Sequence, residues 1–279
     1  MMGDEIESAA TELERPGGGN AASAQELPLN QLAPLTPNAW LRYDMIKRML
    51  PPGVTSVLEV GCGQGALGAR LSEQYERYLG IEPDEGSFQV AQGRFAHLRH
   101  GEVRSTHVES LDPAERFDLV CAFEVLEHIE DDATALKHWA ERLNPGGWLL
   151  LSVPAHQHRY AAADQVVGHF RRYDPEQLSA LVKQTGFEDI EVREYGAPLG
   201  YALEFGRNAI GRRKLKRMSG VSMEQRTGAS GRLFQPSNAA VSALTRYGTS
   251  PFRYLQRALP HGPGLVLRAK LPAGKQAEA

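Results

Sequence analysis

Short apolar runs and amphipathic helical stretches alternate along the chain, and this alternation predicts its architecture. The run of β-branched and apolar residues at 54–60 predicts a buried strand. Glycines on alternate positions follow this strand, and an apolar helical period starts directly after them (Gly61, Gly63 and Gly65, then Ala66, Leu67, Leu71 and Tyr75). Glycine permits a positive φ, and the first N–H groups of the helix face the same gap. The strand, turn and helix therefore form a cradle for a ligand of nucleotide size.

The same alternation continues downstream. Apolar segments at residues 78–81, 103–108, 117–122, 148–153 and 187–194 predict further strands. Helical patterns lie between them, at 87–98, along the stripe formed by Ala133, Leu136, Trp139, Ala140 and Leu143, and from Asp174 to Gly186. Another helix, with Thr36 as its N-cap and Pro37 in its first turn, precedes the first strand. This order is typical of an α/β fold with a doubly wound, mostly parallel sheet.

Two regions differ from this α/β core, which we place at residues 36–198. Residues 1–35 are rich in Ala, Gly, Glu and Pro without an apolar period, so we expect a disordered tail. Residues 199–262 carry eleven Lys and Arg residues against Glu204 and Glu224, in a chain whose net charge is −3. Amphipathic helical patterns with basic faces at 199–218 and 239–259 predict a helical cap. An anionic partner, an oligomeric or membrane-surface contact, or a solvated basic face would each explain this charge.

Composition limits the class of protein. The chain has 279 residues with 42% hydrophobic and 23% charged residues, which is typical of a globular protein. No apolar run approaches the ~20 residues of a membrane span, and the N-terminus lacks the basic and then apolar start of a signal peptide, so we expect a cytoplasmic location. Cys62 and Cys121 have no C-x-x-C spacing, which favours buried thiols over a disulfide or zinc site.

An acidic residue ends the second predicted strand. Glu82 stands where a carboxylate can accept hydrogen bonds from both ribose hydroxyls of an adenosine. Gly61, Gly63 and Ala66 also fit a permissive dinucleotide fingerprint, with Glu82 near the usual distance for its ribose-binding acid. A hydride-transfer enzyme is therefore the first alternative for this cradle.

Five segments together resemble the ordered motifs of class I S-adenosylmethionine-dependent methyltransferases. They are Val57-Leu58-Glu59-Val60-Gly61-Cys62-Gly63-Gln64-Gly65, Gly80-Ile81-Glu82, Phe117-Asp118-Leu119-Val120, Val125-Leu126-Glu127-His128 and Leu143-Asn144-Pro145-Gly146-Gly147. The resemblance covers roughly residues 40–194 and disfavours hydride transfer. It implies a seven-stranded Rossmann-like sheet whose last strand is antiparallel. Residues 265–270, within a final segment 263–279, fit that strand after an unusually long helical insertion.

The resemblance also implies S-adenosylmethionine as the cofactor and assigns its contacts. The glycine loop would hold the methionine part, through Glu59, Gly61, Cys62, Gly63 and Gly65. Glu82 and the following Pro83 would hold the ribose, and the loop with Phe123 and Glu124 would close over the sulfonium end. The adenine-binding Asp of the family has no clear counterpart among His107, Val108 and Glu109.

Methyl transfer needs a positioned nucleophile, and it needs a base when the acceptor still carries its proton. Histidines lie in the predicted loops where the ligand-facing strand ends of an open α/β sheet converge. His128 follows the fourth strand, and the segment after the fifth offers His156, His158, Asp164 and His169. Of these, we expect His128 and His169 to be the catalytic residues.

A divalent metal is a further hypothesis from the same segment. Glu124, Glu127 and His128 have the spacing E-x-x-E-H, which is similar to the metal-binding segment of ubiquinone-pathway O-methyltransferases and small-RNA 2′-O-methyltransferases. His169 is the nearest counterpart of the later histidine that completes the latter site. Such a set would suit Mg²⁺, Mn²⁺ or Zn²⁺, and ordinary loop structure explains it equally well.

The acceptor is predicted to lie against Arg171, Arg172 and Tyr173, where the arginines could clamp a carboxylate or phosphate or pair with nearby acids. The expected function is methyl transfer to an oxygen atom of a small molecule, and the two arginines would suit an acceptor that bears a negative charge. Three alternatives stay open. They are an RNA or tRNA methyltransferase that tracks phosphates with the basic segment, a membrane-associated quinone or lipid methyltransferase, and a protein that binds the cofactor without catalysis.

Overall fold

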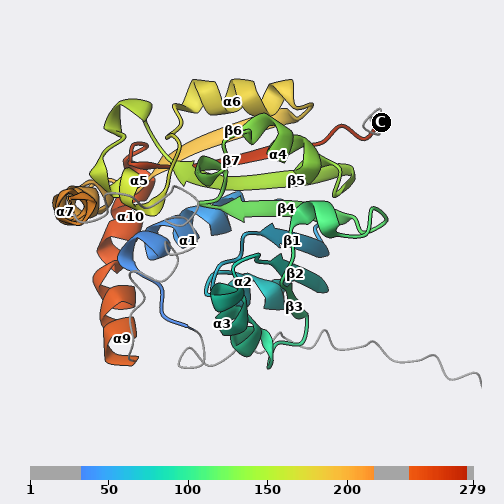
Figure 1. Ribbon diagram of the computed structural model, residues 1–279, viewed down its shortest axis with the longest axis horizontal. Coiled ribbons are helices and arrows are strands. Elements are labelled where there is room, and N and C mark those ends of the chain that lie inside the picture. The colour runs from blue at the N-terminus through green and yellow to red at the C-terminus, as the bar shows by residue number, and fades with distance from the viewer. Residues whose placement is uncertain (1–32, 217–238, 275–279) are drawn as a thin grey trace, which may run out of the picture.

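A seven-stranded sheet with helices on both faces forms the centre of the computed structural model, which describes residues 33–216 and 239–274 (Figure 1). The strands are β1 (Ser56–Val60), β2 (Arg77–Ile81), β3 (Gly101–Arg104), β4 (Phe117–Phe123), β5 (Leu143–Pro154), β6 (Glu188–Tyr195) and β7 (Gly264–Lys270). Their order is β3-β2-β1-β4-β5-β7-β6. The first five pair in parallel, and β7 pairs antiparallel with β5 and β6. The predicted doubly wound, mostly parallel sheet with an antiparallel last strand is confirmed.

Two apolar clusters hold the helices on the two faces of the sheet. The helices are α1 (Pro37–Met49), α2 (Gly68–Leu71), α3 (Glu85–Phe95), α4 (Asp132–Ala140) and α6 (Pro175–Gln184). Leu58 of β1 belongs to the cluster with α4 and α6, whereas its neighbour Val57 belongs to the cluster with α1, α2 and α3. Successive side chains of a strand point to opposite faces, so a continuous apolar strand is buried on both sides.

Local capping signals place the first helices. The Thr36 hydroxyl accepts a hydrogen bond from the Ala39 N–H at 3.2 Å, and Pro37 opens α1 as predicted. Asp84 caps α3 in the same way, through the Ser87 N–H at 2.9 Å. Because Asp84 is the cap, α3 begins two residues earlier than the apolar pattern alone indicates.

Two predicted boundaries are wrong. The third strand spans Gly101–Arg104, not 103–108, because a 3-10 turn over Val108–Ser110 takes the chain away from the sheet. The fifth strand starts earlier than the predicted 148–153, because the Asn144-Pro145-Gly146-Gly147 segment lies within β5. The pairing of β4 with β5 shifts between Phe117 and Leu119, and Gly146 adopts a φ of +77° there, as in a bulged strand.

Within the described part of the insertion, three helices precede β7, where the sequence predicts a helical insertion. α7 (Leu199–Leu215) packs against α5 (Ala162–Val167), while α9 (Ala239–Gly248) and α10 (Ser250–Ala258) lie along α1 (Figure 1). The second predicted helix is thus two helices, with Thr249 between them. The predicted tail up to residue 32 and residues 217–238 of the basic segment lie outside the described residues. None of the helices in the described ranges combines the length and apolar character needed to cross a bilayer.

Candidate active site

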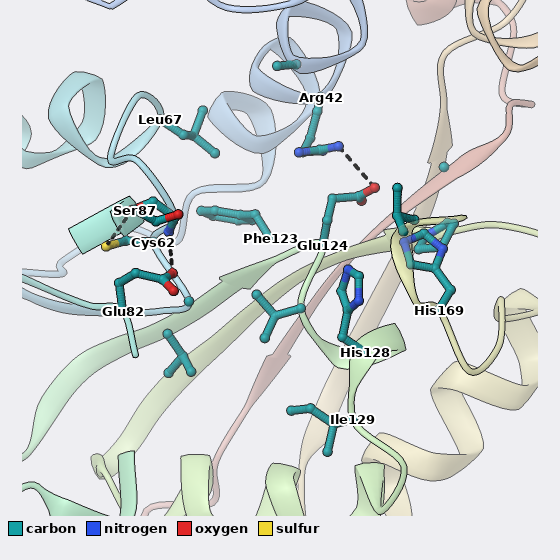
Figure 2. Close-up of a pocket in the computed structure, with 18 of the residues that line it drawn as sticks. Arg42, Cys62, Leu67, Glu82, Ser87, Phe123, Glu124, His128, Ile129 and His169 are labelled. Carbon is teal, nitrogen blue, oxygen red and sulfur yellow. Dashed lines mark hydrogen bonds and ion pairs between the residues drawn. The ribbon is translucent and has the colours of Figure 1, made fainter. Parts of the chain in front are cut away.

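A cavity of about 1000 Å³ opens where the parallel strands end. The glycine turn after β1, the ends of β2 and β4, and residues of α1, α5 and α7 line it. Figure 2 shows Glu82 and Cys62 at one side of this space and His128 and His169 at the other, with Phe123 and Glu124 between them. Pockets for one small molecule measure roughly 300–1,000 Å³, so this cavity has room for a cofactor together with a second small ligand.

The glycine turn has the backbone geometry expected of a cradle. Gly61, Gly63 and Gly65 have φ values of +66°, +55° and +72°. A Cβ added to Gly61 would lie 2.7 Å from Val125 Cγ2, and one added to Gly65 would lie 2.8 Å from Phe95 Cε2. The Cβ direction of Gly63 is open to 4 Å, and Gly63 lines the cavity. The first and third glycines are therefore required by packing, whereas the middle one leaves space that a ligand can fill. The turn fits the methionine part of S-adenosylmethionine.

Glu82 is fixed at the end of β2 by backbone donors. The N–H groups of Gly63 and Asp84 donate to its two carboxylate oxygens at 2.8 and 2.9 Å (Figure 2). Burial raises the pKa of this carboxyl, although the two hydrogen bonds counter the increase. Each oxygen retains acceptor capacity toward the cavity, as a ribose-binding acid requires. Pro83 lies beside it in the lining.

Glu59 and Cys62 are buried neighbours of the turn. The Tyr78 hydroxyl donates to Glu59 Oε2 at 2.8 Å, and burial raises the pKa of Glu59 to about 7. Burial likewise raises the pKa of the Cys62 thiol. Cys62 and Cys121 are both free and buried, which confirms the expectation of buried thiols. Glu59 and Cys62 both line the cavity, so both predicted cofactor contacts have access to it.

Glu124 occupies a strained position directly after β4. Its φ is +59°, a value that a residue with a side chain seldom adopts, and its carboxylate pairs with the Arg42 guanidinium at 3.1 Å. Arg42 also donates to the Tyr195 hydroxyl at 3.1 Å. Burial opposes the charge of Arg42, but the contributions of Glu124, Tyr195 and Glu127 together outweigh it and raise the pKa of Arg42 above its ordinary value. This ion pair fixes the loop that the sequence places over the sulfonium end, and Phe123 lines the cavity beside it.

The structure brings His128 and His169 together. Their rings meet edge to face with centroids 4.6 Å apart, and both line the cavity (Figure 2). His128 Nδ1 lies 3.3 Å from the Gly168 carbonyl, and burial lowers the pKa of His128 to about 3. His169 Nδ1 lies 3.0 Å from Asp164 Oδ1. Both imidazoles can therefore donate through Nδ1 and present Nε2 as an acceptor.

Glu127 lies under this pair without a hydrogen-bond partner for either carboxylate oxygen among the described residues. Its side chain is fully buried, and burial raises the pKa of this carboxyl well above its ordinary value. Ligand atoms of Glu127, His128 and His169 lie within 4.8 Å of one another, and a divalent cation fits this donor set. Glu124, the fourth residue of the metal hypothesis, is not in this group and pairs with Arg42 instead.

The three predicted acceptor residues are mostly engaged elsewhere. Arg171 pairs with Asp132 at 2.6 Å and lies outside the cavity lining, and the fully buried Tyr173 donates to the same carboxylate at 2.9 Å. Arg172 reaches the lining, but two bonds tie it to Asp164 and another ties it to Glu204. These pairings hold Arg171 and Tyr173 outside the cavity lining, and their contact with an acceptor stays a prediction.

Several lining residues lie outside the sequence motifs. Arg42 and Asn38 come from α1, Tyr195 ends β6, and Arg207 and Ile210 come from α7. No local spacing marks them, because three separate elements bring them to one place. The charge of the basic segment is the one sequence signal that points to Arg207.

Comparison with known proteins decides the family. The profile of a family described as a methyltransferase domain matches residues 7–192, which is more than half of the chain. The chain belongs to this methyltransferase-domain family. Its predicted resemblance to class I S-adenosylmethionine-dependent methyltransferases is thereby confirmed.

Relatives of this methyltransferase chain match over shorter stretches. The ubiquinone biosynthesis O-methyltransferase of Bradyrhizobium diazoefficiens is 38% identical over 102 residues, which cover 36% of this chain and 40% of the relative. A methyltransferase of Mycobacterium tuberculosis, itself uncharacterised, is 36% identical over 116 residues, which cover 40% of this chain and 57% of the relative. The chain thus spans about half the length of the curated relatives it matches.

Solved structures share the fold of this methyltransferase. The [4+2]-cyclase SpnF superposes with a TM-score of 0.55 at 20% identity, over 84% of this chain and 81% of SpnF. The N-methyltransferase NodS from Bradyrhizobium japonicum, solved with S-adenosylhomocysteine, has a TM-score of 0.51 at 18% identity, over 83% and 86% of the two chains. A cyclase and an N-methyltransferase on one fold show that the acceptor chemistry must be argued from the site.

Proposed function

We propose that this protein transfers a methyl group from S-adenosylmethionine to an oxygen atom of a small-molecule acceptor. One observation carries the proposal: a single cavity joins the open side of Gly63 and the Glu82 carboxylate to the paired imidazoles of His128 and His169. When bound, the cofactor supplies an activated methyl group on its sulfonium. The chain supplies orientation and a proton acceptor, and orientation alone can be worth ~7–11 kcal/mol.

His169 is the better proton acceptor of the two imidazoles. Its contact with Asp164 favours the tautomer that carries the proton on Nδ1 and leaves Nε2 to accept a hydroxyl proton. Bonds from His169 and Arg172 outweigh burial and lower the pKa of Asp164 to about 2, so this carboxylate stays ionised beside the ring. His128, with its pKa near 3, stays neutral and serves as a polar neighbour of the acceptor.

A metal-assisted version of the same transfer is the second candidate, and the unpartnered Glu127 carboxylate favours it. Glu127, His128 and His169 would hold a divalent cation, which would lower the pKa of an acceptor hydroxyl. In this version the cation, together with His169, would promote deprotonation of the acceptor hydroxyl.

Tritiated-methyl transfer into fractionated cell extract tests the proposal. We expect label in a small-molecule fraction, and His169→Asn should lower the rate by about 10²–10⁴-fold while S-adenosylhomocysteine affinity, measured by calorimetry, stays unchanged. His97→Asn is the matched control, because His97 is exposed and lies outside the cavity lining.

The other outcomes separate the alternatives. Label in RNA would contradict a small-molecule acceptor, and label confined to membrane lipid or quinone would identify the membrane-associated alternative. Tight cofactor binding without any labelled product would indicate a protein that binds the cofactor without catalysis. Activity that survives a chelator would exclude the metal-assisted version.

A further inference from the structure

One cation of the cavity wall is not balanced by a carboxylate. Arg42 pairs with Glu124, and Arg172 pairs with Asp164 and Glu204. Arg207 instead contacts the neutral Asn38 amide, whose oxygen accepts from its two terminal nitrogens at 3.0 and 3.1 Å. Within residues 33–216 and 239–274, no carboxylate oxygen lies within 4.0 Å of the Arg207 guanidinium. Arg207 therefore differs from the other two arginines of the lining.

The position of Arg207 on α7 directs it to the cavity. Gly200, Arg207, Ile210, Gly211 and Lys214 line the cavity, and the last four follow the spacing of one helical face. Gly211 packs so closely on α5 that an added Cβ would lie 2.9 Å from the Ala163 nitrogen. This contact brings the face of α7 against the segment that carries His169. The guanidinium itself lies against Asn38 of α1, near enough to Glu124 and Arg172 for their charges to act on it.

The surroundings of Arg207 disfavour its bare charge. Arg207 is exposed, but the protein atoms around its guanidinium remove part of its hydration and lower its pKa, and the nearby charges of Arg172 and Arg42 act in the same direction. Glu124 and Glu204 act in the opposite direction from a greater distance than an ion pair. A cation in such a place gains most from an anion that binds directly, because direct pairing compensates for the lost hydration.

We propose that Arg207 binds a carboxylate or phosphate group of the acceptor and so selects anionic small molecules. This inference rests on the proposed function and assigns its substrate class. The planar guanidinium can pair with either group through two parallel hydrogen bonds. Val166, Val167 and Ile210 give the same cavity apolar surface, so the favoured acceptor carries one anionic group on an apolar body.

The test uses the full chain and small-molecule extract separated beforehand into anionic and neutral pools. We expect tritiated-methyl label in the anionic pool, in a product that an anion exchanger retains at pH 7. Release of that charge by phosphatase identifies a phosphate, whereas a phosphatase-resistant product that loses its charge near pH 2 identifies a carboxylate.

Variants then test whether Arg207 is responsible for the preference for anionic acceptors. Arg207→Gln should raise KM for the labelled pool by about 10–100-fold, the cost of losing a charged hydrogen bond, and leave S-adenosylhomocysteine affinity unchanged. Arg207→Lys should restore part of the loss, because a point charge remains. Arg212→Gln is the control: Arg212 lies on the same helix, is exposed and does not line the cavity.

Three results would overturn the assignment. They are label only in neutral products, an unchanged KM in Arg207→Gln, and a loss of S-adenosylhomocysteine affinity as large as the loss toward the acceptor. The last result would place the guanidinium on the cofactor carboxylate. Absence of label in every pool would contradict the proposed function itself, so the two failures are distinguishable.

Discussion

The two ends of the sheet differ in how completely hydrogen bonds satisfy their carboxylates. At the amino end, Asp118 Oδ2 accepts from the backbone N–H and hydroxyl groups of Thr55 and Ser56, and Oδ1 accepts from the Asn144 amide. These hydrogen bonds outweigh partial burial and hold the pKa of Asp118 well below its ordinary value. At the carboxyl end, burial raises the pKa of Glu59 and of Glu127, and Glu127 has no hydrogen-bond partner within the described residues. A closed network ties strands together, whereas an incomplete one leaves bonding capacity for a ligand.

The largest effect is expected at the glycine turn. Gly63→Val places a branched side chain in the open part of the cavity and should weaken S-adenosylhomocysteine binding at least ~100-fold, about 2.7 kcal/mol. Gly53→Val is the matched control, because Gly53 also has a positive φ and open space around its Cβ position but does not line the cavity. Both variants should unfold with a similar loss of about 1–2 kcal/mol. Equal loss of affinity in both, measured by calorimetry, would contradict the cradle assignment.

The second largest effect is expected at Glu59, at the carboxyl end of the sheet. It is a decrease in the unfolding free energy as pH rises. The pKa of Glu59 is about 7 in the folded protein and lies above that of an unfolded chain, near 4.5, so the folded state holds the proton more tightly. The contribution of Glu59 to the unfolding free energy is complete below about pH 4.5 and decreases by up to ~3 kcal/mol as pH rises to about 7. Urea unfolding at pH 5 and 8 should show this decrease in the wild type and not in Glu59→Gln. Persistence of the full decrease in Glu59→Gln would refute the assignment.

At the amino end of the sheet, the contribution of Asp118 to the unfolding free energy should have the opposite pH dependence and a smaller magnitude. The folded-state pKa of Asp118 lies below the unfolded value, so its contribution is present above about pH 4 and is lost as pH falls. Asp118→Asn should lower the unfolding free energy by about 1–2 kcal/mol at pH 7, a range reduced for solvent screening, and by less near pH 3. Glu76→Gln, at an exposed acid, is the control and should leave both values unchanged. A loss that is the same at both pH values would argue against the ionised network.

The smallest effect concerns Arg171, which the sequence assigns to the acceptor, and its ion-pair partner Asp132. Arg171 and Asp132 lie 2.6 Å apart and are partly exposed, so a double-mutant cycle with Arg171→Gln and Asp132→Asn should give a coupling energy of about 0.5–1 kcal/mol in unfolding. Coupling in unfolding indicates a structural ion pair. A coupling near zero together with a raised KM in Arg171→Gln would restore Arg171 as an acceptor contact.

The motifs predict the fold well because each is local. Strand, glycine turn and helix around Gly61, and the acid at Glu82, lie within some thirty residues, and their order along the chain implies the parallel sheet. Boundaries set by a single turn are harder to predict. The 3-10 turn at Val108 and the bulge within β5 depend on which backbone groups find partners, and apolar spacing does not report that.

The acceptor side of the site is less predictable because it is assembled from distant elements. His128 and His169 are found from their places after two strands, and the structure brings them together. The pairing of Arg171 with Asp132, by contrast, joins residues 39 positions apart, and nothing in the spacing distinguishes it from an acceptor contact. Arg207 belongs to an insertion whose net charge is evident from the sequence, but only the packing of α7 on α5 shows which of its cations reaches the cavity.

Helix α7 is anchored through Glu204, Asn208 and Gly211, and other positions of the helix take no part in this anchor. Buried Glu204 accepts from Arg159 and Arg172, which fixes the helix to the loop between β5 and α6. Positions 207, 210 and 214 lie further along the same helix and take no part in that anchor. Mutations there can change which acceptor is admitted without disturbing the anchor or the cofactor cradle. Divergence of acceptor preference among proteins that share this helix should therefore be concentrated at these three positions, which are also the natural targets for directed evolution of the enzyme.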